Sequence, residues 1–245
     1  MMYTSCFSAS DHALAGQKWI STRQRLRVWS GNIFLGGLSL LVALVVMFLL
    51  VSQAQAQNAN ASTPDGLVRM ISQEVLDEIR ADRTLQSGDI DRLNALVERR
   101  VMPHINFTRM TALSVGRNWR SATPEQQQIL MKEFRQLLLL TYADAVRQVT
   151  DTTIQIRPLR ARPDDDEVIV RTQVLRPGKE AIQLDYRLEK SANGWKIFDL
   201  NILGLWLIEN YRTQFNQIVT ANGIDGLISS MQEKNRTLSK HAAAK

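Results

Sequence analysis

Cysteine and histidine are almost absent from this chain of 245 residues. Its one cysteine is Cys6, and of its three histidines only His104 lies far from both ends of the sequence. Beyond the first 56 residues the chain therefore has no disulfide and no thiolate ligand, and its stability rests on its core alone. A metal site there would depend on carboxylates, which suit hard cations rather than zinc. We interpret His104, which follows Pro103, as a capping or surface residue.

A large net charge and catalytic sequence motifs are lacking as well. The formal charge is +6, but the first 56 residues hold four basic residues and one acidic residue, so half of this charge precedes the main part of the chain. The remainder has no cluster of Lys and Arg, which argues against nucleic-acid binding. The sequence also contains no Gly-x-Ser-x-Gly, no glycine-rich phosphate loop and no His-Glu-x-x-His.

The carboxylates are weak candidates for a catalytic or metal site. The dense run at residues 164–167, Asp-Asp-Asp-Glu, lacks the spaced ligands of a calcium-binding loop and indicates a solvated hairpin turn. Asp185 is expected on the polar face of a strand, and Asp199 is expected in an ion pair with an arginine. We therefore expect no catalytic residue, no metal and no cofactor, and the sequence predicts a protein that is not an enzyme.

Residues 33–51 form an apolar run of 19 residues without a charge. As a helix this run would span roughly 28 Å, close to the roughly 30 Å hydrocarbon core of a bilayer. Basic residues precede it, and a small-x-small cleavage site ends at Ala56, so residues 1–56 are predicted to be a basic leader with a signal peptide. The alternative is an uncleaved inner-membrane anchor, because the run exceeds the about 7–15 residues of a signal core. In both cases the remainder is exported.

Beyond a small, polar linker at residues 57–64, the hydrophobic spacing changes along the chain. Apolar residues stand three and four apart up to about residue 149 and then alternate residue by residue. The clearest helix start is a capping box of Thr123 and Gln126 with Pro124 at the first helical position. The expected helices are 66–81, 89–101, 107–116, 124–149, 205–220 and a short one from 223, and the expected strands are 153–159, 167–175, 181–190 and 194–202.

Helices followed by strands and then by helices indicate an α+β domain over residues 65–238, with a polar tail at 239–245. Short, turn-rich links between the strands predict a meander. We expect a curved antiparallel sheet of four to five strands, with one face solvated and the other packed against several helices. In the third strand the covered residues would be Ile182, Leu184, Tyr186 and Leu188, and the solvated ones Gln183, Asp185, Arg187 and Glu189.

Several segments of the chain occur in the order found in a known family. They are ALSVGRNWRSATPEQQ at 112–127, continuing to residue 143, then GWKIFDL at 194–200, NYRTQF at 210–215 and GIDGL at 223–227. Together they resemble the MlaC family, also called the toluene-tolerance family, of periplasmic phospholipid carriers in Gram-negative bacteria. The resemblance covers about residues 65–238.

The resemblance implies a fold similar to the nuclear-transport-factor-like (NTF2-like) cone, with extra helices and a deep apolar cavity for acyl tails. It implies a monomeric periplasmic carrier, without a cofactor, that shuttles phospholipid and maintains the lipid asymmetry of the outer membrane. The implied partners are an outer-membrane lipoprotein complex and an inner-membrane ABC transporter with an MCE-type lipid-binding ring. One departure lies at residues 203–206, Leu-Gly-Leu-Trp, where the family tends toward an acidic residue, glycine, an aliphatic residue and serine.

The wide apolar faces of the predicted helices and sheet fit either a plain core or a core left partly open as a cavity for an apolar ligand. On the second interpretation, Arg117, Arg120 and Arg212 would contact the lipid headgroup or a partner protein. The expected cavity lining is Val115, Phe134, Leu138, Tyr142, Val170, Ile182, Leu184, Tyr186 and Trp195.

Two other functions stay open. The chain would be a periplasmic adaptor if its apolar groove received a helix of a partner protein. It would be a small isomerase on the same cone-shaped fold if a buried base, chosen from His104, Asp185 and Asp199, faced the pocket. Lipid bound in an aqueous preparation would separate the carrier from both.

Overall fold

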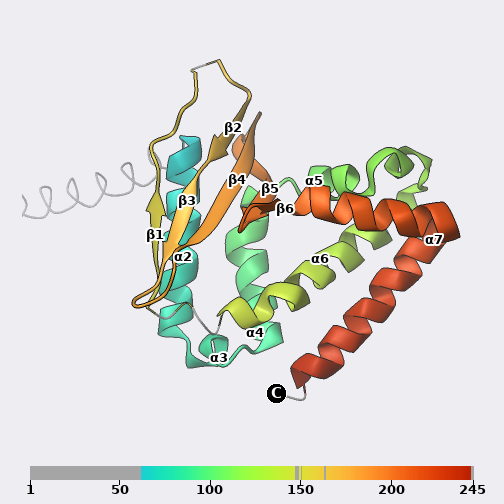
Figure 1. Ribbon diagram of the computed structural model, residues 1–245, viewed down its shortest axis with the longest axis horizontal. Coiled ribbons are helices and arrows are strands. Elements are labelled where there is room, and N and C mark those ends of the chain that lie inside the picture. The colour runs from blue at the N-terminus through green and yellow to red at the C-terminus, as the bar shows by residue number, and fades with distance from the viewer. Residues whose placement is uncertain (1–61, 147–148, 150, 163, 244–245) are drawn as a thin grey trace, which may run out of the picture. The chain divides into compact units, whose positions relative to one another are not determined.

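The computed structural model describes residues 62–146, 149, 151–162 and 164–243. The predicted leader in residues 1–56 and most of the linker lie outside these residues. Helices come first, the strands follow, and a long helix closes the chain, which is the predicted order (Figure 1). Among the described residues, no helix is both long enough and apolar enough to cross a membrane. The helical elements are α2 (Pro64–Ala81), α3 (Arg83–Gln86), α4 (Ile90–Leu96), η1 (Val97–Val101), η2 (Met102–His104), α5 (Phe107–Val115), η3 (Gly116–Ser121), α6 (Pro124–Val146) and α7 (Leu207–Ala243).

Side-chain caps fix where the main helices begin. Thr123 Oγ1 accepts a hydrogen bond from the Gln126 backbone N–H at 3.2 Å, and Gln126 Oε1 accepts one from the Thr123 N–H at 3.0 Å. This reciprocal pair is the predicted capping box, and it satisfies two backbone donors that the helix itself leaves free. Thr63 caps α2 with a single hydrogen bond, which its Oγ1 accepts from the Gly66 N–H at 3.2 Å.

The helix predicted at 89–101 changes character along its length. Asp89 caps it by accepting a hydrogen bond from the Arg92 N–H at 2.9 Å, and α4 is a regular α-helix up to Leu96. From Val97 to Val101 the chain winds as a π-helix, η1, and the 3₁₀ turn η2 follows at Pro103. Turns of π-helix are rare and are often found at functional sites.

The sheet has six strands, and all of their pairings are antiparallel. Its order is β1-β3-β4-β5-β6, and β2 pairs with β4 beyond the end of β3. The strand predicted at 167–175 is thus interrupted at Arg171, and both of its halves pair with β4. The strands are β1 (Thr153–Ile156), β2 (Glu167–Val170), β3 (Thr172–Leu175), β4 (Ile182–Ser191), β5 (Gly194–Ile202) and β6 (Leu205–Trp206).

Asp185 on β4 was expected to be solvated, and this prediction is wrong. Its residue is only 4% exposed, although its position in the strand alternation places it on the predicted polar face. The cause is the interruption of the neighbouring strand, because Asp185 Oδ1 accepts a hydrogen bond from the Thr172 N–H at 3.1 Å. Gln183 Nε2 donates to the other carboxylate oxygen at 2.7 Å. Asp185 therefore provides a side-chain acceptor for a backbone N–H at the strand break.

The start of the last helix also differs from the prediction, because residues 205–206 form strand β6. A two-residue turn joins β5 to β6, and both of its residues, Leu203 and Gly204, have positive φ, of 53° and 89°. A turn with two positive φ angles matches the twist of a hairpin, but it strains a residue with a side chain. Leu203 and Leu205 are each 66% exposed.

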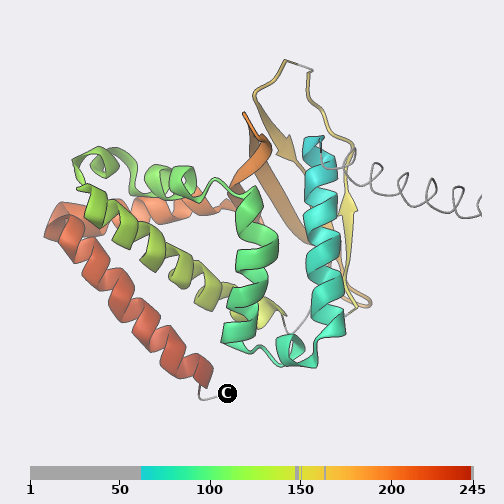
Figure 2. The same ribbon diagram turned by 180° about the vertical axis from the view of Figure 1, so that it is seen from behind.

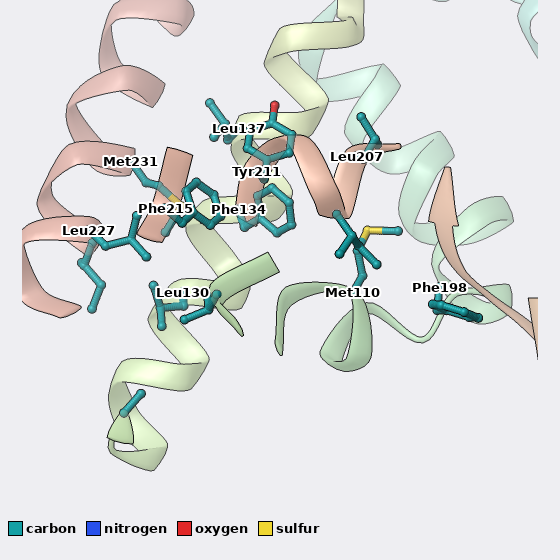
Figure 3. Close-up of a cluster of buried hydrophobic side chains, with 14 residues drawn as sticks. Met110, Leu130, Phe134, Leu137, Phe198, Leu207, Tyr211, Phe215, Leu227 and Met231 are labelled. Atoms are coloured by element: carbon teal, nitrogen blue, oxygen red, sulfur yellow. The ribbon is translucent and has the colours of Figure 1, made fainter. Parts of the chain in front are cut away.

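Helices pack against the sheet and against each other in separate clusters of apolar side chains. Helix α2 runs along the sheet in both views (Figures 1 and 2) and contributes Leu67, Val68 and Ile71 to a cluster with strand residues such as Leu188. A second cluster lies between α5, α6 and α7. At its centre the ring of Phe134 stands 4.9 Å from that of Tyr211 and 5.3 Å from that of Phe215 (Figure 3).

Helix α7 is interrupted at the place where the sequence predicted one C-terminal helix to end and another to begin, and its second part is longer than the predicted short helix. It kinks at Gly223, whose φ of 70° and ψ of −174° are available almost only to glycine. The part after the kink turns back along α6 (Figure 2), and Asn235 Nδ2 donates to the Glu133 carbonyl at 3.0 Å. Helix α7 extends to Ala243, into the predicted polar tail.

Candidate functional site

An apolar cavity of about 280 Å³ lies between helices α2, α4, α5 and α6 and the segments η1 and η2. One residue of the sheet, Leu200 on β5, closes it. Nearly all of its lining side chains are hydrophobic, as expected for a site that receives an apolar ligand. The lining residues are Val75, Ile79, Leu93, Asn94, Leu96, Val97, Val101, Met102, Ile105, Phe107, Met110, Arg135, Leu138, Leu139, Tyr142, Val146 and Leu200.

Helical periodicity explains why these residues share one space. Helix α6 contributes Leu138, Tyr142 and Val146 at intervals of four residues, and α2 contributes Val75 and Ile79 at the same interval. Residues four apart lie on one face of a helix, so each helix presents a continuous apolar row to the cavity. The remaining wall comes from the chain between α4 and α5.

The segment before α5 joins this wall to the sheet. Ile105 forms a parallel bridge with Ile197 of β5, and the Asn106 N–H donates to the Ile197 carbonyl at 2.8 Å. The Asn106 side chain then caps α5 by accepting from the Arg109 N–H at 3.0 Å. Phe107 and Met110 are thereby directed at the cavity from a fixed helix start.

The polar members of the lining are few, and two of them, Arg135 and Asn94, are in contact. The guanidinium of Arg135 forms an ion pair with Glu98 of η1, and its Nη2 donates to Asn94 Oδ1 at 3.2 Å. The Tyr142 hydroxyl is the other polar group, and burial raises the pKa of Tyr142 above its ordinary value, so it is neutral at physiological pH.

Two of the nine residues predicted to line a cavity, Leu138 and Tyr142, lie in its wall. Val115 and Phe134 belong to the cluster between α5, α6 and α7. Three more pack in the cluster under α2, and two lie partly buried in the first half of β4. The residues of the α2 cluster are Val170, Tyr186 and Trp195, and those of β4 are Ile182 and Leu184.

The three arginines predicted to contact a headgroup or a partner lie outside this cavity. Arg117 and Arg212 border a separate surface hollow beside Gly116. Arg212 Nε also donates to the Leu113 carbonyl at 2.8 Å, which ties α7 to the end of α5. Arg120 is exposed on η3.

Residues of α4 and η1 and Arg135 were not among the predicted site residues. The sequence did predict helices at both places, but periodicity does not tell which of two apolar faces meets a cavity. A basic residue within an otherwise apolar stripe was the available signal, because Arg135 precedes Leu138 and Leu139 by one turn of α6.

The cavity is not lined by any of the three candidate bases of an isomerase, which are His104, Asp185 and Asp199. Burial raises the pKa of Asp199, and the carboxylate accepts hydrogen bonds from the Leu200 and Ile208 N–H groups at 2.9 and 3.1 Å. It also pairs with Arg187 Nη1 at 3.0 Å, which confirms the predicted ion pair. Burial, with a smaller effect of Lys196, lowers the pKa of His104.

No group of three or more His, Cys, Asp or Glu side chains suited to a metal ion occurs within the described ranges. The acidic run at 164–167 is mostly exposed. Within it, Asp165 Oδ2 accepts a hydrogen bond from the Arg162 N–H at 2.8 Å, as in a turn. The site is thus an apolar cavity with a small polar edge.

The chain that forms this cavity matches a known protein family. The family model described as "MlaC protein" matches residues 69–233. The chain belongs to the MlaC family. The match spans α2 to the C-terminal half of α7, and therefore every element that lines the cavity.

Individual relatives agree with the family. The MlaC binding protein of an intermembrane phospholipid transport system in Haemophilus influenzae is 23% identical over 77% of this chain and 90% of its own length. The toluene tolerance protein ttg2D of Pseudomonas putida is 24% identical over 67% of this chain and 77% of its own length.

This chain is also similar to a protein that has been solved with its ligand bound. It is a phospholipid-binding protein from Ralstonia solanacearum in complex with a phospholipid, 41% identical, with a TM-score of 0.69. The alignment covers 70% of this chain and 96% of that protein. The MlaC fold of this chain is thus one that is known to hold a phospholipid in another protein.

Proposed function

We propose that this chain is a phospholipid carrier that holds acyl tails in the cavity between α2, α4, α5 and α6. The observation that carries the proposal is an apolar cavity of about 280 Å³ in a chain 41% identical to a protein solved with phospholipid bound. No bond is made or broken in this function, and no cofactor is needed.

The physical need for such a carrier follows from the cost of exposing acyl tails to water. Two tails of about 15 methylenes each, at roughly 0.8 kcal/mol for each buried CH₂, cost on the order of 24 kcal/mol. A free phospholipid therefore does not cross an aqueous compartment at a useful rate. A cavity lined almost entirely by apolar side chains replaces the burial of that part of the tails which it takes up.

The cavity volume indicates how the protein accepts its ligand. The volume of about 280 Å³ lies just below the about 300–1,000 Å³ of ligand pockets, so a lipid with two tails requires a larger space. The wall formed by α4 and η1 is the part that we expect to move, because π-helical turns are rare and are frequently found at functional sites.

The proposed place of action is the periplasm. The apolar run at residues 33–51, with basic residues before it, supports export of the remainder, either with cleavage or with an anchor retained. We propose a monomeric shuttle between an outer-membrane lipoprotein complex and an inner-membrane ABC transporter with an MCE-type ring. The name of the Haemophilus relative, an intermembrane transport binding protein, supports this assignment.

A vesicle transfer assay tests the carrier function. The chain is exported with its own leader, purified without detergent and mixed with donor vesicles that contain a fluorescent phospholipid and with unlabelled acceptor vesicles. We expect transfer in proportion to protein concentration. Transfer at the protein-free rate, with an intact fold, would contradict the proposal and favour a protein-binding adaptor.

A further inference from the structure

The charged group nearest to the apolar cavity is Arg135 of α6. Of the seventeen lining side chains, Arg135 is the one that carries a charge, and Asn94 is the one with an amide. The methylene groups of an arginine can cover apolar surface while its guanidinium stays near water. The Arg135 side chain is 28% exposed, so its guanidinium lies at the edge of the cavity and not in its depth.

Arg135 is held by two neighbours from the opposite wall. It forms an ion pair with Glu98 of η1, whose side chain is 49% exposed, and donates to Asn94 Oδ1 of α4 at 3.2 Å. These contacts join α6 to the α4–η1 wall across the cavity edge. A partly exposed ion pair contributes little to stability, so another anion can replace Glu98 without unfolding the protein.

The neighbouring arginines of η1 are engaged elsewhere. Arg99 pairs with Glu78 of α2, and Arg100 pairs with Glu78 at 3.0 Å and with Glu74 at 3.4 Å. Neither lines the cavity. Arg135 is therefore the guanidinium that a ligand with its tail in the cavity would meet.

We propose that Arg135 binds the phosphodiester of the carried lipid and that Glu98, released from Arg135, accepts the ammonium group of a zwitterionic headgroup. The proposal rests on the carrier function above and names the headgroup site of the same cavity. A guanidinium binds two phosphate oxygens at once through parallel N–H groups, which a lone lysine cannot do.

The charge of the site then selects the class of lipid. When Arg135 turns to the phosphate, the Glu98 carboxylate is left beside the headgroup. A primary ammonium, as in phosphatidylethanolamine, compensates this carboxylate, whereas an anionic lipid such as phosphatidylglycerol leaves it unpaired. An unpaired charge in a partly desolvated site is unfavourable, so the zwitterionic lipid is preferred.

Loading from mixed vesicles tests the headgroup site. The full chain, exported with its own leader, is incubated with vesicles of equal phosphatidylethanolamine and phosphatidylglycerol, and the lipid in the protein fraction is identified by mass spectrometry. We expect the wild type to load several times more of the zwitterionic lipid. Arg135→Gln should lower total loaded phospholipid about tenfold, since it removes hydrogen bonds to a charged group.

Glu98→Gln separates the headgroup role from a merely structural ion pair. It removes the same ion pair but keeps Arg135, so loading should persist and the ratio of the two lipids should approach one. Lys132→Gln is the matched control, because Lys132 is an exposed cation on α6 that does not line the cavity. It should change neither the amount nor the ratio.

The outcomes distinguish the two proposals. Equal losses of loading in Arg135→Gln and Glu98→Gln, with equal falls in melting temperature, would show a structural pair and overturn the headgroup site. Full loading of Arg135→Gln, or an unchanged lipid ratio in Glu98→Gln, would overturn it as well and leave the carrier function intact. A wild type that loads no lipid from any vesicle would contradict the carrier function itself.

Discussion

Replacement of Leu138 by aspartate should empty the cavity without unfolding the protein. Leu138 is partly buried and lines the cavity, so in the lipid-free protein water can reach a carboxylate at this position. An acyl tail would displace that water and leave the charge without a partner, which costs several kcal/mol. Since about 1.4 kcal/mol corresponds to a factor of ten in affinity, we expect Leu138→Asp to bind phospholipid about two to three orders of magnitude more weakly.

The adjacent residue supplies the control. Leu137 is 6% exposed and packs in the cluster between α6 and α7 (Figure 3), so Leu137→Asp buries a charge in the core and should unfold the domain. Leu138→Asp should lower stability by only about 1–2 kcal/mol, at roughly 2–4 °C of melting temperature for each kcal/mol. The assay combines thermal unfolding with quantification of co-purified lipid. Wild-type lipid content in a folded Leu138→Asp protein would refute the assignment of this cavity.

Further predictions concern the cavity, the pH dependence and the kink. Leu139→Trp should fill part of the cavity and reduce lipid loading, with a stability change of about 1–3 kcal/mol; unchanged loading in the vesicle assay would argue against this cavity. Burial raises the pKa of Glu78, but hydrogen bonds from Arg100 and Arg99 outweigh this and leave it below its ordinary value of 4.5. The stability that this carboxylate contributes is therefore present above pH 4.5 and is lost as the pH falls through its lowered pKa. In urea titrations below pH 4.5, the free energy of unfolding of Glu78→Gln should depend less steeply on pH than that of the wild type. The same pH dependence in both proteins would contradict this. Gly223→Ala should lower the free energy of unfolding by about 1–3 kcal/mol, because an alanine is strained at the φ of 70° of the kink. Nothing lies within 4 Å of the added methyl group, so a steric clash does not contribute. Unchanged stability in calorimetry would contradict this strain.

Local signals in the sequence predicted local structure well. The capping box of Thr123 and Gln126 involves only residues three apart, and the structure forms it as predicted. The break at Arg171 was not predictable from alternation, because it depends on Asp185 of the neighbouring strand, which replaces a missing backbone partner. Strand β6 was missed because it depends on a positive φ at Leu203, a conformation that leucine seldom adopts.

The candidate site was predictable only in part for a similar reason. Helix α6 is apolar over a wide arc: Phe134 and Leu137 lie in the cluster with α7, and Leu138 and Tyr142 both pack against that cluster and line the cavity. Periodicity placed Phe134, Leu138 and Tyr142 on a single stripe, but it does not tell where along that stripe the cluster with α7 ends and the cavity wall begins. Similarly, the partners of Arg135, Glu98 and Asn94, come from a segment about 40 residues earlier in the chain, which periodicity does not place beside α6.

Native mass spectrometry of the exported chain, purified without detergent, tests the carrier function most directly. The released small molecule is identified in the same experiment. The carrier function predicts one phospholipid bound to each protein chain. A folded chain that carries no lipid, and that takes up none from vesicles, would contradict it.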